Sequence, residues 1–226
     1  MNTLRASASP RSSAMSGSAA IDRPIVFVVD DDISVRESLE CLIADAGWRA
    51  EVFESAQAFL DHPRQAVPSC LVLDVGLPDL NGLELQKRIG DQSVLPIIFI
   101  TGHGDIPMTV RAIKAGAIEF LTKPFGPEML LGSISAALER SCASLHEEAD
   151  LDALRVRYES LSLRERQVMA LVVRGQLNKQ VGGDLGISEI TVKAHRGKMM
   201  RKMQARSLPE LVNMAARLGH ATAGSD

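Results

Sequence analysis

The stretch LVLDVGLPDLNGLEL, residues 71–85, decides the fold, because a short apolar run ends at Asp74 and a helix-like segment follows after a turn rich in Gly, Pro and Asn. Further polar residues stand in the same relation to an apolar run: Asp30-Asp31-Asp32 after 25–29, Thr101 after 97–100, and Lys123 after 118–121. The carboxyl ends of parallel strands meet at one edge of an open sheet. We therefore expect these side chains to line a single crevice.

Residues 24–140 alternate between strand-like and helix-like segments. Five β-rich apolar runs are present, at 25–29, 48–53, 70–73, 96–100 and 118–121. Apolar residues at helical spacing follow the first, third, fourth and fifth runs, and Gly47, Gly90 and Gly116 stand where the first three of these helices should end. Alternating βα units predict an α/β fold, a five-stranded doubly wound parallel sheet of flavodoxin-like type.

Composition limits the classes of protein that the chain fits. Its 226 residues suffice for two modest domains, each with a core. No apolar run approaches the roughly 18 to 20 residues that span a bilayer, and the three cysteines lack CxxC spacing. We therefore expect a cytoplasmic protein that does not bind membranes. Residues 1–23 are rich in Ser and Ala and lack a secretory apolar run, which predicts a disordered leader, with Met15 as an alternative start.

Charge is distributed unevenly along the chain. Residues 24–142 contain 9 Lys and Arg against 17 Asp and Glu, a net charge of −8. Residues 160–226 contain 11 against 5, a net charge of +6. This asymmetry indicates that the two parts have different partners and that the second part binds a polyanion.

The predicted crevice has the chemistry of a phosphoryl-transfer site. Carboxylates suit Mg²⁺ or Mn²⁺, and a bound cation would offset the charge of an arriving phosphoryl group. Asp74 is the candidate nucleophile because it is the lone acid after the central strand, while Thr101 and Lys123 are suited to hold phosphoryl oxygens. Each residue alone is more typical of a turn or a solvated side chain. Their joint occurrence at one edge favours a site.

The crevice residues lie in segments that resemble the receiver domain of bacterial two-component response regulators: FVVDDDISVRESL (27–39), LVLDVGLPDLNGLEL (71–85), and IIFITGHGDIPMTVRAIKAGAIEF with LTKPF (97–125). The resemblance covers about residues 24–140. It implies phosphorylation of Asp74, metal binding by Asp30, Asp31, Asp74 and the Gly76 carbonyl, a switch pair of Thr101 and Phe120, and phosphate binding by Lys123.

Gly76 departs from the family pattern, in which a larger side chain is common at this position. The departure leaves the lifetime of the phosphoryl group open. It also argues against a haloacid-dehalogenase-type phosphatase, which would need a general acid two residues after its nucleophile. We therefore expect a regulator and not an enzyme.

Residues beyond 140 show only helical patterns. Residues 141–159 lack Pro and Gly, which predicts a rigid helical linker, with a dimerising coiled coil as the alternative. Within 160–226, Ser162 and Glu165 have capping-box spacing. Two short helices, at about 178–185 and 189–203, flank a glycine turn, which is typical of a helix-turn-helix.

The helix at 189–203 has two different faces. Val192, His195, Met199 and Met203 share a face that we expect to be buried, and a basic stripe beside a small residue suits a DNA major groove. The segments LSLRERQVMALVVRGQLNKQ (161–180), LGISEITVKAHRGKMMRKM (185–203) and RSLPELV (206–212) are similar to the LuxR-type output domain of FixJ-type regulators. This likeness implies DNA contacts by Asn178, Lys179, Thr191, Lys193, Ala194, Arg196, Gly197, Lys198 and Arg201. Gly182 and Gly183 replace the usual alanines, which predicts a locally soft helix.

These features predict a phosphorylation-activated transcriptional regulator. A sensor histidine kinase would phosphorylate Asp74, the 106–126 surface would rearrange and form a homodimer, and the output domain would bind promoter DNA and act on RNA polymerase. Activation is favoured over repression by family analogy. Two alternatives are a DNA-binding protein with a vestigial receiver and an RNA-binding antiterminator. The intact crevice residues argue against the first, and the helix-turn-helix pattern against the second.

Overall fold

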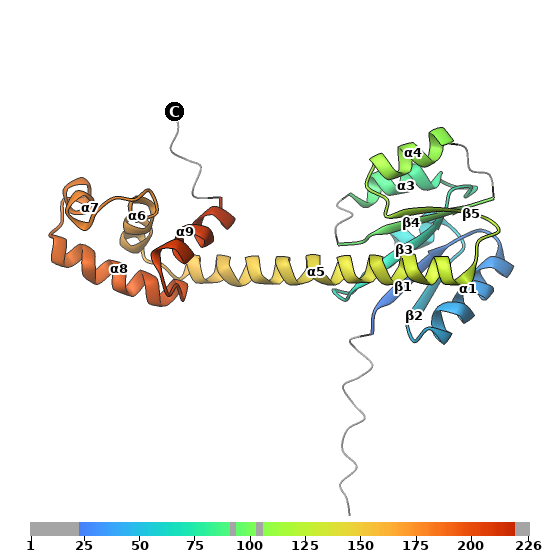
Figure 1. Cartoon of the computed structure of the whole chain (residues 1–226), viewed down its shortest axis with the longest axis horizontal. Helices are drawn as coiled ribbons and strands as arrows, with labels where there is room; N and C mark the ends of the chain where they lie inside the picture. Colours follow the sequence, from blue (N-terminus) through green and yellow to red (C-terminus); the bar gives the residue numbers. More distant parts are fainter. Residues whose placement is uncertain (1–22, 91–93, 103–105, 220–226) are drawn as a thin grey trace, which may run out of the picture. The chain divides into compact units, whose positions relative to one another are not determined.

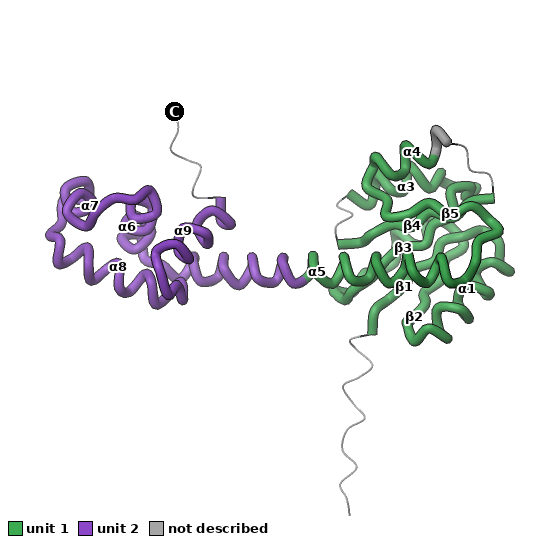
Figure 2. Tube along the Cα trace, in the orientation of Figure 1, with its two compact units in different colours: residues 1–145 green, residues 146–226 purple. Residues whose placement is uncertain are grey.

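The computed structural model describes residues 23–90, 94–102 and 106–219. They form two compact units, the first ending at Leu145 and the second beginning at His146 (Figure 2). Apart from Arg23, the predicted leader lies outside the described residues. Within these ranges, no helix combines the length and the apolar character needed to cross a membrane.

The first unit is built on a five-stranded parallel sheet with the order β2-β1-β3-β4-β5 (Figure 1). The strands are β1 (Ile25–Val29), β2 (Arg49–Phe53), β3 (Ser69–Asp74), β4 (Ile97–Thr101) and β5 (Glu119–Thr122). The predicted sheet is confirmed, and each strand begins and ends within one residue of its predicted position. Strands β1, β3 and β4 are buried along their whole length, as apolar strands covered on both faces should be.

Helices cover both faces of the sheet. One face packs against α1 (Ile33–Asp45) and the first part of α5 (Pro127–Glu159). The other packs against α2 (Ala56–Leu60), α3 (Gly82–Ile89) and α4 (Ile106–Lys114). Successive strand side chains alternate between these two cores, because side chains in a strand point to opposite faces.

Helix α2 is absent from the helical segments that the sequence predicts. It is only five residues long, too short to show helical periodicity. Two acceptors fix its first turn: the Ser55 hydroxyl accepts from the Ala58 amide, and the Asp79 carboxylate accepts from the amides of Ala56 and Gln57. The helix is therefore set in part by a residue more than twenty positions away.

Helix α5 runs unbroken for 33 residues and contributes to both units. Leu130 and Ile134 belong to the core of the first unit, and Leu154 to that of the second. Buried Ser141 fixes the helix against the sheet, because its hydroxyl accepts from the Ser69 amide at 3.0 Å and donates to the Val94 carbonyl at 2.6 Å. The predicted linker, 141–159, is thus part of one helix that begins on the sheet.

The second unit consists of the end of α5 with α6 (Leu163–Val172), α7 (Asn178–Leu185), α8 (Glu189–Met203) and α9 (Leu208–Arg217). Its apolar core includes side chains from every one of these helices. Gly186 ends α7 with φ +65°, a left-handed conformation that glycine adopts at little cost. The predicted helix-turn-helix geometry is thus present at α7 and α8.

Candidate functional site

One ammonium group joins the two buried carboxylates at the carboxyl edge of the sheet. The Lys123 Nζ lies 2.6 Å from Asp30 Oδ2 and 3.0 Å from Asp74 Oδ1. The carboxylates follow β1 and end β3, which are neighbours in the sheet, and Lys123 follows β5. The side chains of Asp30 and Asp74 are 1% and 9% exposed. The structure therefore brings these three predicted residues into direct contact.

Two glycines leave room around Asp74. The Gly76 amide donates to Asp74 Oδ2 at 2.5 Å, and a Cβ at Gly76 would lie 3.1 Å from the same oxygen. A side chain at that position would thus begin in tight contact with the carboxylate. A Cβ at Gly82 would lie only 2.7 Å from the Asp74 carbonyl oxygen, so the end of β3 would have to move. The sequence alone does not reveal this requirement at Gly82.

The carboxylates and the lysine perturb one another. Burial raises the pKa of Asp30 above its usual range, although Lys123 and the Asp32 amide act in the opposite direction. Burial acts to lower the pKa of Lys123, but its hydrogen bonds to Asp30 and Asp74 outweigh this and the pKa is raised. Lys123 is therefore charged at neutral pH, and a charged Asp30 is held at some energetic cost.

The oxygens at this edge fit a divalent cation. Asp30 and Asp74 supply buried carboxylate ligands of the kind that Mg²⁺ prefers, and a cation would offset the burial of Asp30. Asp31 is exposed. In the described part of the chain, no three His, Cys, Asp or Glu side chains are already arranged around a metal position. Binding would therefore require Asp31 to turn towards the two buried carboxylates.

The predicted switch residues lie on β4, which neighbours the strand that carries Asp74, and on β5, the next strand along the sheet. Thr101, at the end of β4, is 4% exposed, and its carbonyl accepts from the Lys123 amide at 2.7 Å. Phe120 is half-buried on β5, and its ring centroid lies 6.1 Å from that of Phe99. Movement of Phe120 would therefore change the packing of the buried Phe99 ring.

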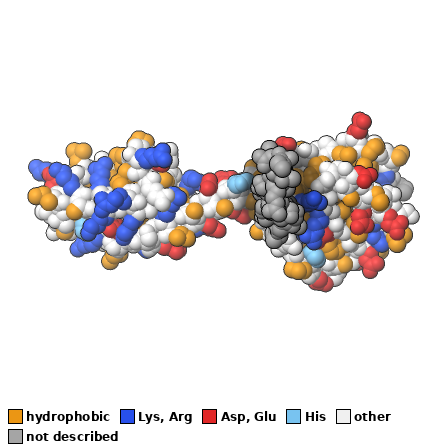
Figure 3. Space-filling model, turned by 90° about the horizontal axis from the view of Figure 1, so that it is seen from below, with side chains coloured by type: hydrophobic (Ala, Val, Ile, Leu, Met, Phe, Trp, Pro, Cys, Tyr) orange, Lys and Arg blue, Asp and Glu red, His pale blue; other side chains and the backbone are white. Residues whose placement is uncertain are grey.

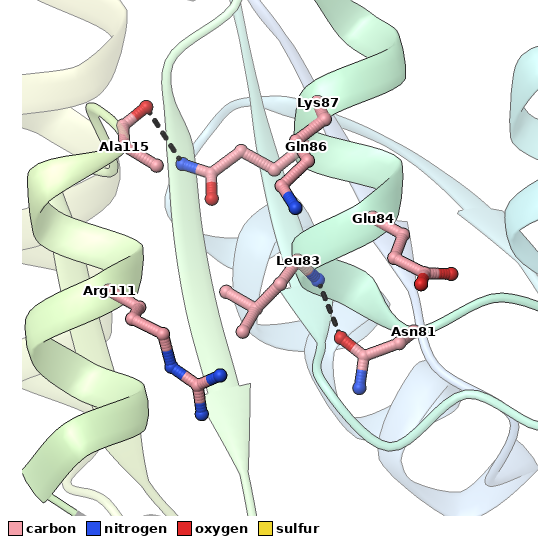
Figure 4. A pocket seen from close by; sticks show the side chains of 7 residues that line it. All are labelled: Asn81, Leu83, Glu84, Gln86, Lys87, Arg111 and Ala115. Carbon is pink, nitrogen blue, oxygen red and sulfur yellow. Dashed lines mark hydrogen bonds between the residues drawn. The ribbon is translucent and has the colours of Figure 1, made fainter.

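A buried glutamine connects α3 to α4. The Gln86 amide nitrogen donates to the Ala112 and Ala115 carbonyls at 3.3 and 3.2 Å, and Figure 4 shows the side chain reaching across to Ala115. It borders a cavity of about 320 Å³ lined by Asn81, Leu83, Glu84, Gln86, Lys87, Arg111 and Ala115. No pattern in the sequence marks Gln86 as buried, because a glutamine on an amphipathic helix usually faces solvent.

The residues predicted to contact DNA all lie on the accessible surface of the second unit. Five are exposed, namely Lys179, Lys193, Ala194, Lys198 and Arg201, and four are half-buried, namely Asn178, Thr191, Arg196 and Gly197. Lys and Arg side chains gather over this unit in Figure 3. The opposite face of α8 is buried at Val192, Met199 and Met203 as predicted, whereas His195 is only half-buried.

Several of these side chains also hold the two helices together. Arg196 Nη1 donates to Asn178 Oδ1 at 3.0 Å, which joins α8 to the first residue of α7. The Lys193 Nζ lies 3.1 Å from Oε1 of Glu189, one turn earlier on the same helix. The Thr191 and Ser188 hydroxyls are 2.8 Å apart, and Ser188 caps α8 by accepting from the Thr191 amide. Arg196 thus ties the middle of α8 to the start of α7, while the contacts of Ser188 and Glu189 order the first turn of α8.

The two glycines in α7 have different surroundings. A Cβ at Gly182 would lie 2.8 Å from the Ile187 carbonyl oxygen, because the turn packs closely against α7. No atom lies within 4 Å of a Cβ at Gly183. Gly182 therefore allows the backbone of the turn to approach α7 closely, a role that the prediction of a soft helix did not include. Of the two glycines, only Gly183 has room for a side chain.

We expect Gly183→Ala to raise the free energy of unfolding of the second unit by about 0.5 to 1 kcal/mol, because alanine loses less backbone entropy in a helix. Gly182→Ala should gain less than this or destabilise the unit, because the Ile187 backbone must shift. Thermal unfolding of both variants by circular dichroism tests the difference. Equal gains would contradict the close approach at Gly182.

An ion pair between a buried glutamate and an exposed lysine anchors the far end of α8. Glu165 is 3% exposed, and its Oε2 accepts from Lys202 Nζ at 2.6 Å and from the Ser162 amide at 2.8 Å. Lys202 also donates to the Ser160 carbonyl, just after α5. The hydrogen bond from Lys202 lowers the pKa of Glu165. The predicted capping box is confirmed, whereas no pattern in the sequence indicates the role of Lys202.

Comparisons with known proteins agree with this division of the chain. The response regulator receiver domain model matches residues 26–135, and the model of bacterial regulatory proteins of the luxR family matches residues 159–215. Nodulation protein W of Bradyrhizobium diazoefficiens is 49% identical over 88% of this chain and 88% of its own length. Transcriptional regulatory protein FixJ of Rhizobium meliloti is 43% identical over 84% and 94%. The solved structure of response regulator StyR, 48% identical, matches with a TM-score of 0.76 and covers 86% of this chain and 99% of its own. The chain therefore belongs to the FixJ-like two-component response regulators, in which a receiver domain is followed by a LuxR-type DNA-binding domain.

Proposed function

We propose that a sensor histidine kinase phosphorylates this regulator at Asp74 and that the phosphorylated protein binds promoter DNA as a dimer. The observation that carries the proposal is the Lys123 ammonium shared by buried Asp30 and Asp74 at the edge of the sheet. The ammonium offsets part of the negative charge of the two acids, which lowers the repulsion that an arriving anionic group would meet.

In the proposed transfer, a carboxylate oxygen of Asp74 attacks the phosphorus of the donor. A phosphorus–oxygen bond forms, and the bond from phosphorus to the histidine nitrogen of the kinase breaks. Lys123, already 3.0 Å from Asp74, would pair with a phosphoryl oxygen, and the Thr101 hydroxyl would donate to another. Mg²⁺ or Mn²⁺, held by Asp30, Asp31, Asp74 and the Gly76 carbonyl, would offset the added negative charge.

The signal would pass from Asp74 to the surface formed by α4 and β5. The phosphoryl group adds about −1.5 to −2 charges, which would draw Thr101 inwards and let Phe120 rearrange beside Phe99. Dimerisation through this surface would bring two α8 helices to successive half-sites, and we propose that the bound dimer activates transcription by RNA polymerase. The basic second unit supports DNA as the ligand.

Acetyl phosphate with Mg²⁺ tests the proposal on the full chain. Peptide mass spectrometry should locate one phosphoryl group, at Asp74, and gel filtration should show a dimer. Affinity for a duplex with two half-sites, selected from random sequence, should rise roughly 100-fold, because the second output domain then binds at high effective concentration. Asp74→Asn should lose the labelling, the dimer and the rise in DNA affinity. Unchanged labelling of that variant would contradict the assigned acceptor, and a labelled protein with unchanged DNA affinity would indicate a vestigial receiver.

A further inference from the structure

An apolar side chain stands fully in solvent at the start of α8. Ile190 is 80% exposed, the highest value among the large apolar side chains in the described ranges. It is the second residue of the helix, and the Ser188 cap holds the turn around it. As a β-branched residue it has few rotamers and loses little freedom on binding. The position is thus rigid, apolar and unburied.

Ile190 continues the face that carries the predicted DNA contacts. Its spacing to Lys193, Ala194 and Gly197 is three, four and seven residues, which places the four on one side of the helix. Ile190 and Ala194 form an apolar strip one turn long, and Lys193, whose ammonium lies 3.1 Å from the Glu189 carboxylate, is on the same side of the helix. Recognition helices of helix-turn-helix proteins contact base edges mainly through their N-terminal residues. Ile190 therefore lies where bases would be read.

We infer that Ile190 reads sequence by contacting the C5-methyl group of a thymine in the major groove. The thymine methyl is the apolar feature of that groove, and apolar side chains contact it in other complexes. Lys193 beside it is suited to guanine O6 and N7, so the half-site should contain a thymine next to a guanine. The inference rests on the proposed DNA-binding function and adds a specificity-determining residue to it.

Charge favours DNA over a protein as the partner of this face. The second unit carries a net charge of +6 over residues 160–226, and Lys193, Lys198 and Arg201 are exposed along the same helix. Phosphates on both sides of a major groove would meet these cations while the apolar strip met the bases. A protein surface would have to match both the strip and the surrounding positive charge.

The experiment uses the phosphorylated full chain and the duplex enriched by it from random sequence. Each thymine of one half-site is replaced in turn by deoxyuridine, which lacks only the methyl group. Wild-type affinity should fall about fourfold at one thymine, the fold-change expected for exposing one methyl group. Ile190→Ala should bind the unmodified duplex more weakly and show no further loss at that thymine. Leu163→Ala, which removes a 75% exposed leucine from α6, is the matched control and should behave as wild type.

The outcomes separate this inference from the function on which it rests. If no duplex is enriched, the DNA-binding function itself is wrong. If a duplex is enriched but deoxyuridine weakens Ile190→Ala and wild type equally at every thymine, the thymine contact is wrong. If Ile190→Ala binds every duplex as wild type does but fails to activate transcription in vitro, Ile190 contacts a protein, which also overturns the inference.

Discussion

Lys123→Met is expected to lower the free energy of unfolding of the first unit by about 3 kcal/mol. Removing the lysine from a buried salt-bridge cluster leaves the two carboxylates without a compensating positive charge. Asp30 and Asp74 would then lie side by side without the cation that now contacts both. Methionine keeps most of the aliphatic length of lysine, so the loss reports charge and hydrogen bonds more than packing. The same variant should respond weakly to acetyl phosphate.

Urea unfolding followed by Trp48 fluorescence measures this loss, because the chain has a single tryptophan and it packs in the first unit. Lys114→Met, which changes an exposed lysine of α4, is the control and should alter stability little.

The loss of stability in Lys123→Met should also depend on pH. The raised pKa of Asp30 means that the folded state binds a proton more readily than the unfolded state. As pH falls through that raised pKa, Asp30 becomes neutral and the loss should shrink. A loss that stays the same as the pH is lowered from neutral into acid would show that the charge is not its cause.

The sequence was sufficient for the sheet and for the residues at its edge. Strands β1, β3 and β4 are buried on both faces, so their apolar runs are nearly continuous and easy to recognise. A polar residue directly after such a run stands out against it, which is why Asp74 and Thr101 could be placed in one crevice. Parallel topology then brings these residues together without further information.

Interactions between distant residues could not be predicted in the same way. Gln86 and Lys202 look like solvent-facing positions on their own helices, and only the fold brings them to Ala115 and Glu165. The space restriction at Gly82 is likewise set by the end of another element. Asp31 shows the converse, since the resemblance to receiver domains implied a metal pair with Asp30 while the structure leaves the Asp31 side chain exposed. Local pattern identifies which residues are unusual, and packing decides what they contact.

Glu165→Ala is expected to destabilise the second unit by about 2 kcal/mol, because it removes the capping-box glutamate of α6 and its charged hydrogen bond with Lys202. Circular dichroism follows the helices of both units, and Trp48 fluorescence follows the first unit alone, so the two signals together identify the transition of the second unit. Glu210→Ala is a close control. Glu210 occupies the same position in α9, where its carboxylate accepts from the Arg206 amide and its own amide donates to the Ser207 cap. It has no lysine partner among the described contacts, so its loss should be about 1 kcal/mol.

Glu165→Gln separates charge from shape in this pair. Glutamine keeps an oxygen that can accept from the Ser162 amide, but it loses the charge that Lys202 stabilises. The pKa of Glu165 is lowered in the folded state, so its contribution is present above the usual value of 4.5 and is lost as pH falls through the lowered pKa. The difference in stability between wild type and Glu165→Gln should therefore be largest near neutral pH and disappear in acid.

Lys202 lies on α8 and also contacts the Ser160 carbonyl after α5. Glu165→Gln should therefore bind DNA normally at low temperature and lose binding at a temperature several degrees lower than wild type does. Retained binding up to the wild-type temperature would show that the pair does not position the recognition helix.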